Sequence, residues 1–223
     1  MITDAAASSL PTTHSRYEQI IFDLLEKGWS VTPDFIQTDI LACMRQAASR
    51  YRDKQYFYRA GIGKGGARTV HNDVRTDYVM WIDPADNASP IKQYLGIIDE
   101  LRRELNRKLL LGLVEFEGHI AFYPRGTYYR KHLDQFRNDD MRIITSILYL
   151  NENWHEEDGG QLRIYTGENS YQDILPHAGQ LVTFLSSEFF HEVLPTNRER
   201  LSITGWYKKR DHNQLLHQAI SPA

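Results

Sequence analysis

The second half of this chain is a succession of short apolar stretches whose residues alternate as β-strands require. Turn-forming residues, among them Gly159, Gly160 and Pro176, separate the stretches. The strands predicted from this pattern span residues 114–123, 128–134, 142–150, 161–166, 171–175, 180–185, 190–194 and 201–209. Eight short strands at this spacing are typical of a sandwich or a jelly roll. The pattern therefore predicts an all-strand core over residues 113–210.

The first half has the periodicity of amphipathic helices. Three helices are predicted, from Tyr17 to Gly28, from Thr32-Pro33 to Tyr51 and from Ser89-Pro90 to Gly112. The Thr-Pro and Ser-Pro pairs read as an N-cap followed by proline in the first turn, and glycine is a common residue at a helix end. We expect these helices to cover one outer face of the sheet. Residues 15–223 then form one α+β domain, preceded by a flexible leader at residues 1–14.

Two short strands, at residues 56–60 and 77–82, interrupt the helical half. The glycine-rich run 61–66 between them lacks the Gly-Lys-Ser/Thr ending of a phosphate loop. Its four glycines lose much entropy when they are ordered. Residues 61–77 are therefore predicted to be a mobile flap, and residues 15–112 a helical support that carries it.

The overall composition excludes some classes of protein. A net charge of −3 and a pI near 6.3 provide no general attraction to nucleic acid or to anionic lipid. No segment reaches the roughly 18 apolar residues of a membrane span, and the N-terminus lacks the features of a secretion signal. The single cysteine, Cys43, suits a reducing compartment, and its place in a helical stripe predicts a buried side chain. We expect a cytoplasmic monomer that binds neither nucleic acid nor membrane.

Four residues in the strand-rich half suggest a metal site with an anion clamp. Side chains two residues apart on an extended strand point the same way, so His132 and Asp134 can grip one metal. His191 comes from a later strand, and two imidazoles with one carboxylate are the ligand set of a non-haem iron(II) site. Arg200 supplies a planar cation that can clamp a carboxylate. The other histidines, His119, His155 and His177, do not have ligand spacing with these residues.

Several motifs in one order extend this pattern and carry a family resemblance. They are Tyr123-Pro124, His132-Leu133-Asp134, Arg142 through Leu148-Tyr149-Leu150-Asn151 to Trp154, Gly159-Gly160-Gln161-Leu162-Arg163-Ile164, His191-Glu192-Val193, and Arg200 through Thr204 to Trp206-Tyr207. Over residues 121–209, and more faintly back to about 56, the chain resembles the iron(II)- and 2-oxoglutarate-dependent dioxygenases. The resemblance is greatest to prolyl hydroxylases of the kind that act on hypoxia-inducible factor. It implies a double-stranded β-helix of the jelly-roll or cupin-like kind, with N-terminal helices on one sheet.

The resemblance also assigns roles to individual residues. It implies that His132, Asp134 and His191 bind Fe(II), which 2-oxoglutarate chelates while leaving room for O2, and that ascorbate can serve as a reductant. Arg200 is then expected to anchor the far carboxylate of 2-oxoglutarate. The other residues assigned to the cosubstrate pocket are Tyr149, Thr204, Tyr123, Leu162, Val193 and Trp206. The connection from Tyr123 to His132 is one residue shorter than in the animal enzymes, which weakens the assignment of Tyr123.

The reaction implied by the resemblance is hydroxylation of a prolyl residue, at C4, in a protein. Arg142, Arg75, Asp77 and Tyr129 match places where such enzymes hold their peptide. The compact chain resembles bacterial members, which are associated with elongation factor Tu, so an exposed proline in a switch loop of that protein is the specific expectation. Oxygen sensing is the role of the animal relatives.

Three other functions are compatible with parts of the pattern. The same iron site could hydroxylate a free amino acid or a small metabolite. The jelly roll could also be a non-catalytic binding protein, although the intact triad and Arg200 argue against that. A zinc hydrolase could use two histidines and an aspartate with an open water position, but it would need neither O2 nor 2-oxoglutarate.

Overall fold

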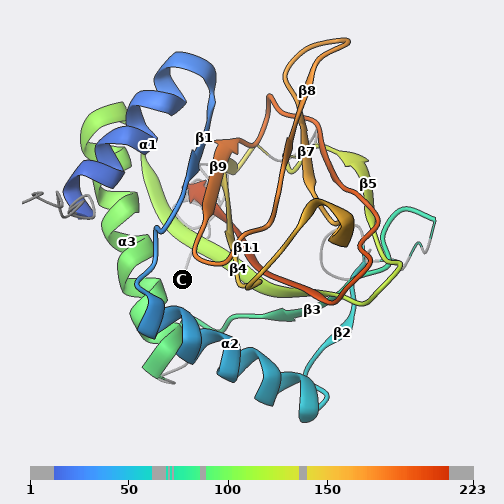
Figure 1. Cartoon of the computed structure of the whole chain (residues 1–223). Coiled ribbons are helices and arrows are strands. Elements are labelled where there is room, and N and C mark those ends of the chain that lie inside the picture. Colours follow the sequence, from blue (N-terminus) through green and yellow to red (C-terminus); the bar gives the residue numbers. More distant parts are fainter. Residues whose placement is uncertain are drawn as a thin grey trace, which may run out of the picture.

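A computed structural model describes residues 13–61, 69, 71, 73–85, 89–135 and 140–210 (Figure 1). Its helices are α1 (Thr13–Lys27), α2 (Thr38–Asp53), α3 (Ser89–Leu109) and the short 3-10 helix η2 (Glu156–Asp158). The strands that precede the predicted core are β1 (Trp29–Thr32), β2 (Tyr58–Arg59) and β3 (Tyr78–Trp81). The remaining strands are β4 (Leu113–Tyr123), β5 (Tyr129–His132), β6 (Arg142–Tyr149), β7 (Leu162–Tyr165), β8 (Tyr171–Ile174), β9 (Leu181–Leu185), β10 (His191–Val193) and β11 (Arg200–Lys209).

The strands form two antiparallel sheets. The larger has the order β1-β9-β6-β11-β4-β3-β2 and the smaller has the order β5-β10-β7-β8. Strands that are distant in the sequence therefore lie side by side, as in a double-stranded β-helix. The eight strands predicted after residue 113 are confirmed with small shifts at their ends, and so is the α+β fold class.

One hydrophobic core lies between the helices and the larger sheet, and another lies between the two sheets. The first joins residues of all three α-helices to strands of the larger sheet, so the helices cover one face of that sheet as expected (Figure 1). Strand β6 serves both cores because its side chains alternate between its faces. Ile144 and Leu148 belong to the helix-side core, whereas Ile147 and Tyr149 belong to the core between the sheets.

The predicted helix start at Thr32-Pro33 is wrong. Residues 29–32 are instead the edge strand β1, which pairs with β9, and α2 begins at Thr38. The side chains that β1 buries are Ser30 and Thr32, and the Ser30 hydroxyl donates to Asp23 at 2.8 Å. The strand does alternate apolar and polar residues, and Trp29 and Val31 pack against the core between the sheets. Four residues are a short run, however, and it does not stand out beside the Thr-Pro start signal.

Three smaller expectations also need correction or lie outside the described residues. Cys43 is exposed on α2, because it falls between the buried positions Leu41 and Met44 of the helical stripe. Helix α1 begins at Thr13, inside the predicted leader, of which residues 1–12 lie outside the described part. Most of the glycine-rich part of the predicted flap, residues 62–68, also lies outside it.

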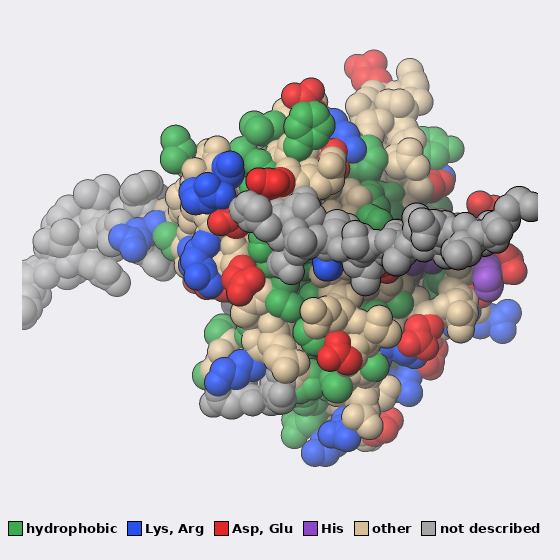
Figure 2. Space-filling model, turned by 60° about the vertical axis from the view of Figure 1, so that its left-hand side comes forward, with side chains coloured by type: hydrophobic (Ala, Val, Ile, Leu, Met, Phe, Trp, Pro, Cys, Tyr) green, Lys and Arg blue, Asp and Glu red, His purple; other side chains and the backbone are tan. Residues whose placement is uncertain are grey.

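On the face in Figure 2, acidic and basic side chains are interspersed. Among the residues that the structure describes, no helix combines the length and apolar character that crossing a bilayer requires.

Candidate metal centre and cosubstrate pocket

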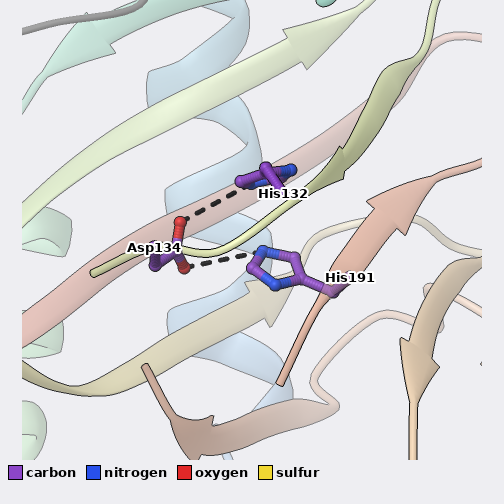
Figure 3. Close-up of side chains that lie close together, drawn as sticks. All are labelled: His132, Asp134 and His191. Atoms are coloured by element: carbon purple, nitrogen blue, oxygen red, sulfur yellow. Dashed lines mark ion pairs between the residues drawn. The ribbon is translucent and has the colours of Figure 1, made fainter. Parts of the chain in front are cut away.

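Three potential metal ligands meet between the two sheets. One donor atom from each of His132, Asp134 and His191 can be chosen so that all lie within 4.8 Å of one another. The Asp134 carboxylate faces both imidazoles (Figure 3), with its Oδ1 3.6 Å from His132 Nε2 and its Oδ2 3.5 Å from His191 Nε2. Asp134 and His191 are buried, and His132 is partly buried.

Strand pairing explains how the two histidines meet. His132 is the last residue of β5, and it lies directly opposite His191, the first residue of β10. Asp134 differs from the expectation, since β5 ends before it and the carboxylate comes from the following bend. The backbone ladder therefore positions the histidines but not the aspartate.

The imidazoles are oriented for metal binding through Nε2. His132 Nδ1 lies 2.7 Å from the Arg130 carbonyl and His191 Nδ1 lies 3.1 Å from the Phe189 carbonyl. A carbonyl only accepts, so each Nδ1 carries the proton and each Nε2 presents its lone pair. Burial, together with neighbouring His132, lowers the pKa of His191 to about 4, which keeps this imidazole neutral at physiological pH.

The donor set fits iron(II). Although burial opposes ionisation of Asp134, His191 and His132 hold the pKa of this carboxyl well below its ordinary value. An ionised carboxylate with two neutral imidazoles suits a non-haem Fe(II) and leaves positions for further ligands. No other histidine of the described residues joins this group.

Arg200 lies deep in the same pocket at the start of β11. It is only 1% exposed, yet within the described part of the chain it has no carboxylate partner. Its Nε donates to the Gly160 carbonyl at 2.9 Å, and its guanidinium lies over the rings of Tyr123 and Tyr149. A buried cation without a counter-ion is costly, so this arrangement fits an anionic ligand such as 2-oxoglutarate.

Tyr149 adds a buried hydroxyl that has no hydrogen-bond partner among the residues that the structure describes. Its ring centroid lies 5.1 Å from the Arg200 guanidinium carbon. Burial raises the pKa of Tyr149 to about 12, so the hydroxyl keeps its proton and can donate. A bound carboxylate can accept from this hydroxyl and also supply the counter-ion that the Arg200 guanidinium lacks among the described residues.

Tyr149→Phe is expected to raise the KM for 2-oxoglutarate several-fold while leaving the stability of the ligand-free protein unchanged or higher. The lost hydrogen bond forms only with the ligand, and an unsatisfied buried hydroxyl is itself destabilising. Tyr207→Phe is the matched control, because that buried hydroxyl donates to the Ile98 carbonyl at 3.1 Å. The control should lose about 1 kcal/mol of unfolding free energy with an unchanged KM. The reverse pattern would remove Tyr149 from the cosubstrate site.

A cavity of about 460 Å³ opens in front of these groups. The three potential metal ligands and Arg200 all line it. So do the other residues predicted around the cosubstrate, which are Tyr123, Leu162, Val193, Thr204 and Trp206. Tyr149 is behind this lining, next to Arg200. The structure thus brings the predicted residues together, while their individual roles stay predictions.

Three of the residues predicted to hold a substrate form a stack that ends on a metal ligand. The Arg75 guanidinium pairs with the buried Asp77 carboxylate through contacts of 2.8 and 2.6 Å. The guanidinium carbon of Arg75 lies 4.2 Å from the Tyr129 ring centroid, and that ring stacks on His132 at 3.6 Å. This arrangement couples the wall of the cavity to the orientation of the His132 ring. Asp77 supports the wall from behind rather than lining the cavity.

Arg142, the fourth, lines the cavity from a different side. Its guanidinium lies 3.5 Å from the Trp206 ring centroid and pairs with Glu117 at 2.8 Å. A cation held flat against an aromatic ring offers both an apolar and a polar edge to a ligand.

Sequence reasoning missed other residues that complete the site. His119, given little weight above, lines the cavity between Trp81 and Trp206, with ring-centroid distances of 5.0 and 5.5 Å. Thr145 donates a hydrogen bond of 2.8 Å to Asp134 Oδ2. The signal that could have revealed His119 is its position opposite Thr204 in the pairing of β4 with β11. This signal can be used only when the two strands are known to be neighbours.

Comparisons with known proteins agree with this geometry. The profile of the 2OG-Fe(II) oxygenase superfamily matches residues 118–208. The hypoxia-inducible factor prolyl hydroxylase of Caenorhabditis elegans is 31% identical over 201 residues, which are 85% of this chain and 28% of that protein. The mouse prolyl hydroxylase EGLN3 is 31% identical over 202 residues, with 85% of this chain and 82% of that protein covered.

Solved structures are similar over most of the chain. A Pseudomonas putida prolyl-4-hydroxylase is 41% identical with a TM-score of 0.80, and the match covers 87% of this chain and all of that one. A Trichoplax adhaerens prolyl hydroxylase, solved with a peptide of the hypoxia-inducible factor oxygen degradation domain, is 25% identical with a TM-score of 0.80 and 94% coverage of both chains.

The first curated relatives are longer proteins, and this chain spans 28 to 43% of their length. The smaller EGLN3 and the Pseudomonas enzyme are nevertheless matched over most or all of their length. Fold, ligand set and buried arginine therefore agree with the sequence relationship, and the chain belongs to the prolyl hydroxylase family of 2-oxoglutarate- and iron(II)-dependent oxygenases.

Proposed function

We propose that this protein is a 2-oxoglutarate-dependent dioxygenase that hydroxylates a prolyl residue, at C4, in a protein substrate. The observation that carries the proposal is that three iron-type ligands and a buried Arg200, which has no carboxylate partner among the described residues, face one cavity. When bound, Fe(II) supplies the oxidative chemistry, which converts 2-oxoglutarate and O2 to succinate and CO2 as a C–H bond is hydroxylated.

The residues of this chain contribute binding, orientation and exclusion of water. His132, Asp134 and His191 hold the metal, and Arg200 with the Tyr149 hydroxyl anchors the far carboxylate of 2-oxoglutarate by charge-assisted hydrogen bonds. Tyr123, Leu162, Val193, Thr204 and Trp206 shape the pocket around that cosubstrate. Their largely buried positions separate the reacting groups from solvent.

A protein substrate is supported by the wall of the cavity and by the relatives. Arg142 on Trp206 and Arg75 on Tyr129 present flat cation–aromatic pairs at the cavity. Such pairs can pack against a pyrrolidine ring and donate to the carbonyls beside it. The Trichoplax relative was solved with a peptide, which supports the same kind of substrate here.

For the specific protein we propose elongation factor Tu, with an exposed proline in a switch loop. The bacterial type of this chain, supported by its 41% identity with the Pseudomonas enzyme, favours a bacterial target. Because the substrate is the finest part of the proposal, it needs its own test.

The test incubates the protein with Fe(II), 2-oxoglutarate, ascorbate and elongation factor Tu, and follows succinate and the mass of the target. We expect one proline to gain one oxygen atom, with about one succinate per hydroxylation and no reaction without O2. A target whose switch-loop proline is replaced by alanine is the matched control. Amino-acid analysis against 4-hydroxyproline standards identifies the carbon.

Each alternative function has its own outcome in this assay. Oxidation of free proline but no target protein would favour a small-metabolite hydroxylase. Iron and 2-oxoglutarate binding without any turnover across proline-containing peptides would favour a binding protein. Activity with Zn²⁺ that persists without O2 and 2-oxoglutarate would favour a hydrolase.

A further inference from the structure

The metal-ligand carboxylate of Asp134, which follows a strand of the smaller sheet, is held by a pair of buried hydroxyls from the larger sheet. Thr145 Oγ1 lies 2.8 Å from Asp134 Oδ2 and 2.9 Å from the hydroxyl of Ser186. Neither hydroxyl residue is exposed at all. Both come from elements of the larger sheet, since Thr145 is in β6 and Ser186 directly follows β9.

The direction of the two hydrogen bonds follows from the chemistry of the groups. An ionised carboxylate only accepts, so the single hydroxyl proton of Thr145 goes to Asp134 Oδ2. The contact between the hydroxyls must then be donated by Ser186 to Thr145. The result is a directed chain from Ser186 through Thr145 to Asp134, in which each bond polarises the next.

These two hydrogen bonds give Asp134 the support that pairing within a strand would otherwise provide. His132 and His191 are paired across β5 and β10, but Asp134 lies in a bend after the end of β5. The bend is tied to the same site by the Gln135 backbone N–H, which donates to the Ser186 carbonyl at 3.3 Å. The Ser186 N–H in turn donates to the Ile143 carbonyl of β6 at 3.0 Å. The larger sheet therefore fixes both the backbone and the side chain of this ligand.

We propose that Thr145, supported by Ser186, is the positioning residue for Asp134. Its hydroxyl holds Oδ2 in a hydrogen bond to the larger sheet and leaves Oδ1 as the metal ligand. A carboxylate that offers one oxygen occupies one coordination position, whereas a free carboxylate can occupy two. Thr145 thereby sets both the affinity for the metal and the number of positions left for other ligands. This inference rests on the proposed iron site but requires no particular substrate.

Thr145→Val, which keeps the shape and removes the hydroxyl, is expected to weaken metal binding about 10- to 100-fold, the usual range when a group that orients a metal ligand is lost. The measurement uses Mn²⁺ with the metal-free protein, and electron paramagnetic resonance counts the free ion. It is done without 2-oxoglutarate or substrate, at a temperature where circular dichroism shows every variant folded. Mn²⁺ affinity equal to wild type in Thr145→Val would overturn the proposal, even if the variant melts at a lower temperature.

Three further variants separate positioning from a general effect on the core. Thr145→Ser keeps the hydroxyl and should restore affinity to within a few-fold of wild type. Thr183→Val is the matched control on the neighbouring strand β9, because the Thr183 hydroxyl is also buried but has no partner within the described part of the chain. The control should bind Mn²⁺ as wild type does. An equal loss in Thr183→Val, or no recovery in Thr145→Ser, would contradict the assignment.

Ser186→Ala tests the direction of the chain. If Ser186 acts through Thr145, its loss alone weakens Mn²⁺ binding only a few-fold, and the double variant binds no worse than Thr145→Val. If the losses of Mn²⁺ affinity of the two single variants multiply in the double variant, Ser186 does not act through Thr145. The absence of peptide hydroxylation by a wild-type protein that binds Mn²⁺ would count against the proposed function and leave this result standing.

Discussion

Replacing His191 by alanine should abolish 2-oxoglutarate turnover. The variant loses one of three ligands, and water entering a buried site cannot reproduce an imidazole whose proton is fixed on Nδ1 by the Phe189 carbonyl. The loss of metal affinity should exceed the roughly 100-fold upper end expected for residues that only orient a ligand. The stability of the metal-free protein should change much less, because the lost interaction is the one between His191 and the bound metal.

The measurement pairs succinate formation with Mn²⁺ binding by the metal-free protein. His177→Ala, at an exposed position remote from the cavity lining, is the control and should behave as wild type in both assays. Full turnover by His191→Ala would show that the metal is held elsewhere. It would remove the basis of the functional assignment.

Arg200→Met should raise the KM for 2-oxoglutarate at least about tenfold, since each hydrogen bond to a charged group contributes about 1.5–3 kcal/mol. Mn²⁺ binding without the cosubstrate should stay close to wild type, because Arg200 is not a ligand. The split between the two affinities distinguishes an anchor for the organic anion from a general support of the site.

For the same substitution we expect an unusually small effect on the stability of the ligand-free protein. Most changes of a fully buried residue destabilise a fold, yet here the ligand-free protein should change by only about 1 kcal/mol. Removal of a buried cation that lacks a carboxylate partner in the described residues offsets the lost bond to the Gly160 carbonyl. What should disappear is the rise in Tm that 2-oxoglutarate with Mn²⁺ gives the wild type.

Arg198→Met is the matched control for this pair of results. Arg198 is exposed, two residues earlier, and pairs with Asp158 at 3.0 Å. Its loss should leave the KM for 2-oxoglutarate unchanged. If Arg200→Met instead unfolds the protein without a change in KM among folded molecules, Arg200 is a structural residue and the anion site lies elsewhere.

The strands of the core could be predicted because most of them bury apolar side chains on at least one face. The rule is weaker at β1, where the fully buried positions are Ser30 and Thr32 and the apolar Trp29 and Val31 are only partly buried. A Thr-Pro pair there has two compatible readings, a helix start or a strand end followed by a turn. Only pairing with β9, more than 140 residues later, decides between them.

The candidate site was predictable to the extent that its residues carry distinctive chemistry. Two histidines, an aspartate and an arginine in this order are rare enough to be noticed. Thr145 in β6 and Ser186 directly after β9 are ordinary residues with no distinctive chemistry. They lie at Asp134 only because the fold brings these two strands together. His119 was similarly hidden, because its place opposite Thr204 depends on the β4–β11 register.

The alternation along β6 places two kinds of constraint on one short segment. Thr145, Ile147 and Tyr149 face the candidate site, whereas Ile144 and Leu148 face the helices. Inserting or deleting one residue would exchange these faces, turning Tyr149 and Thr145 into the helix-side core and bringing bulky aliphatic groups toward the metal. Changes of length should consequently be tolerated in the exposed turn after β7 but not in β6. In β6, a shift of the register by one residue would disrupt both the core and the metal site.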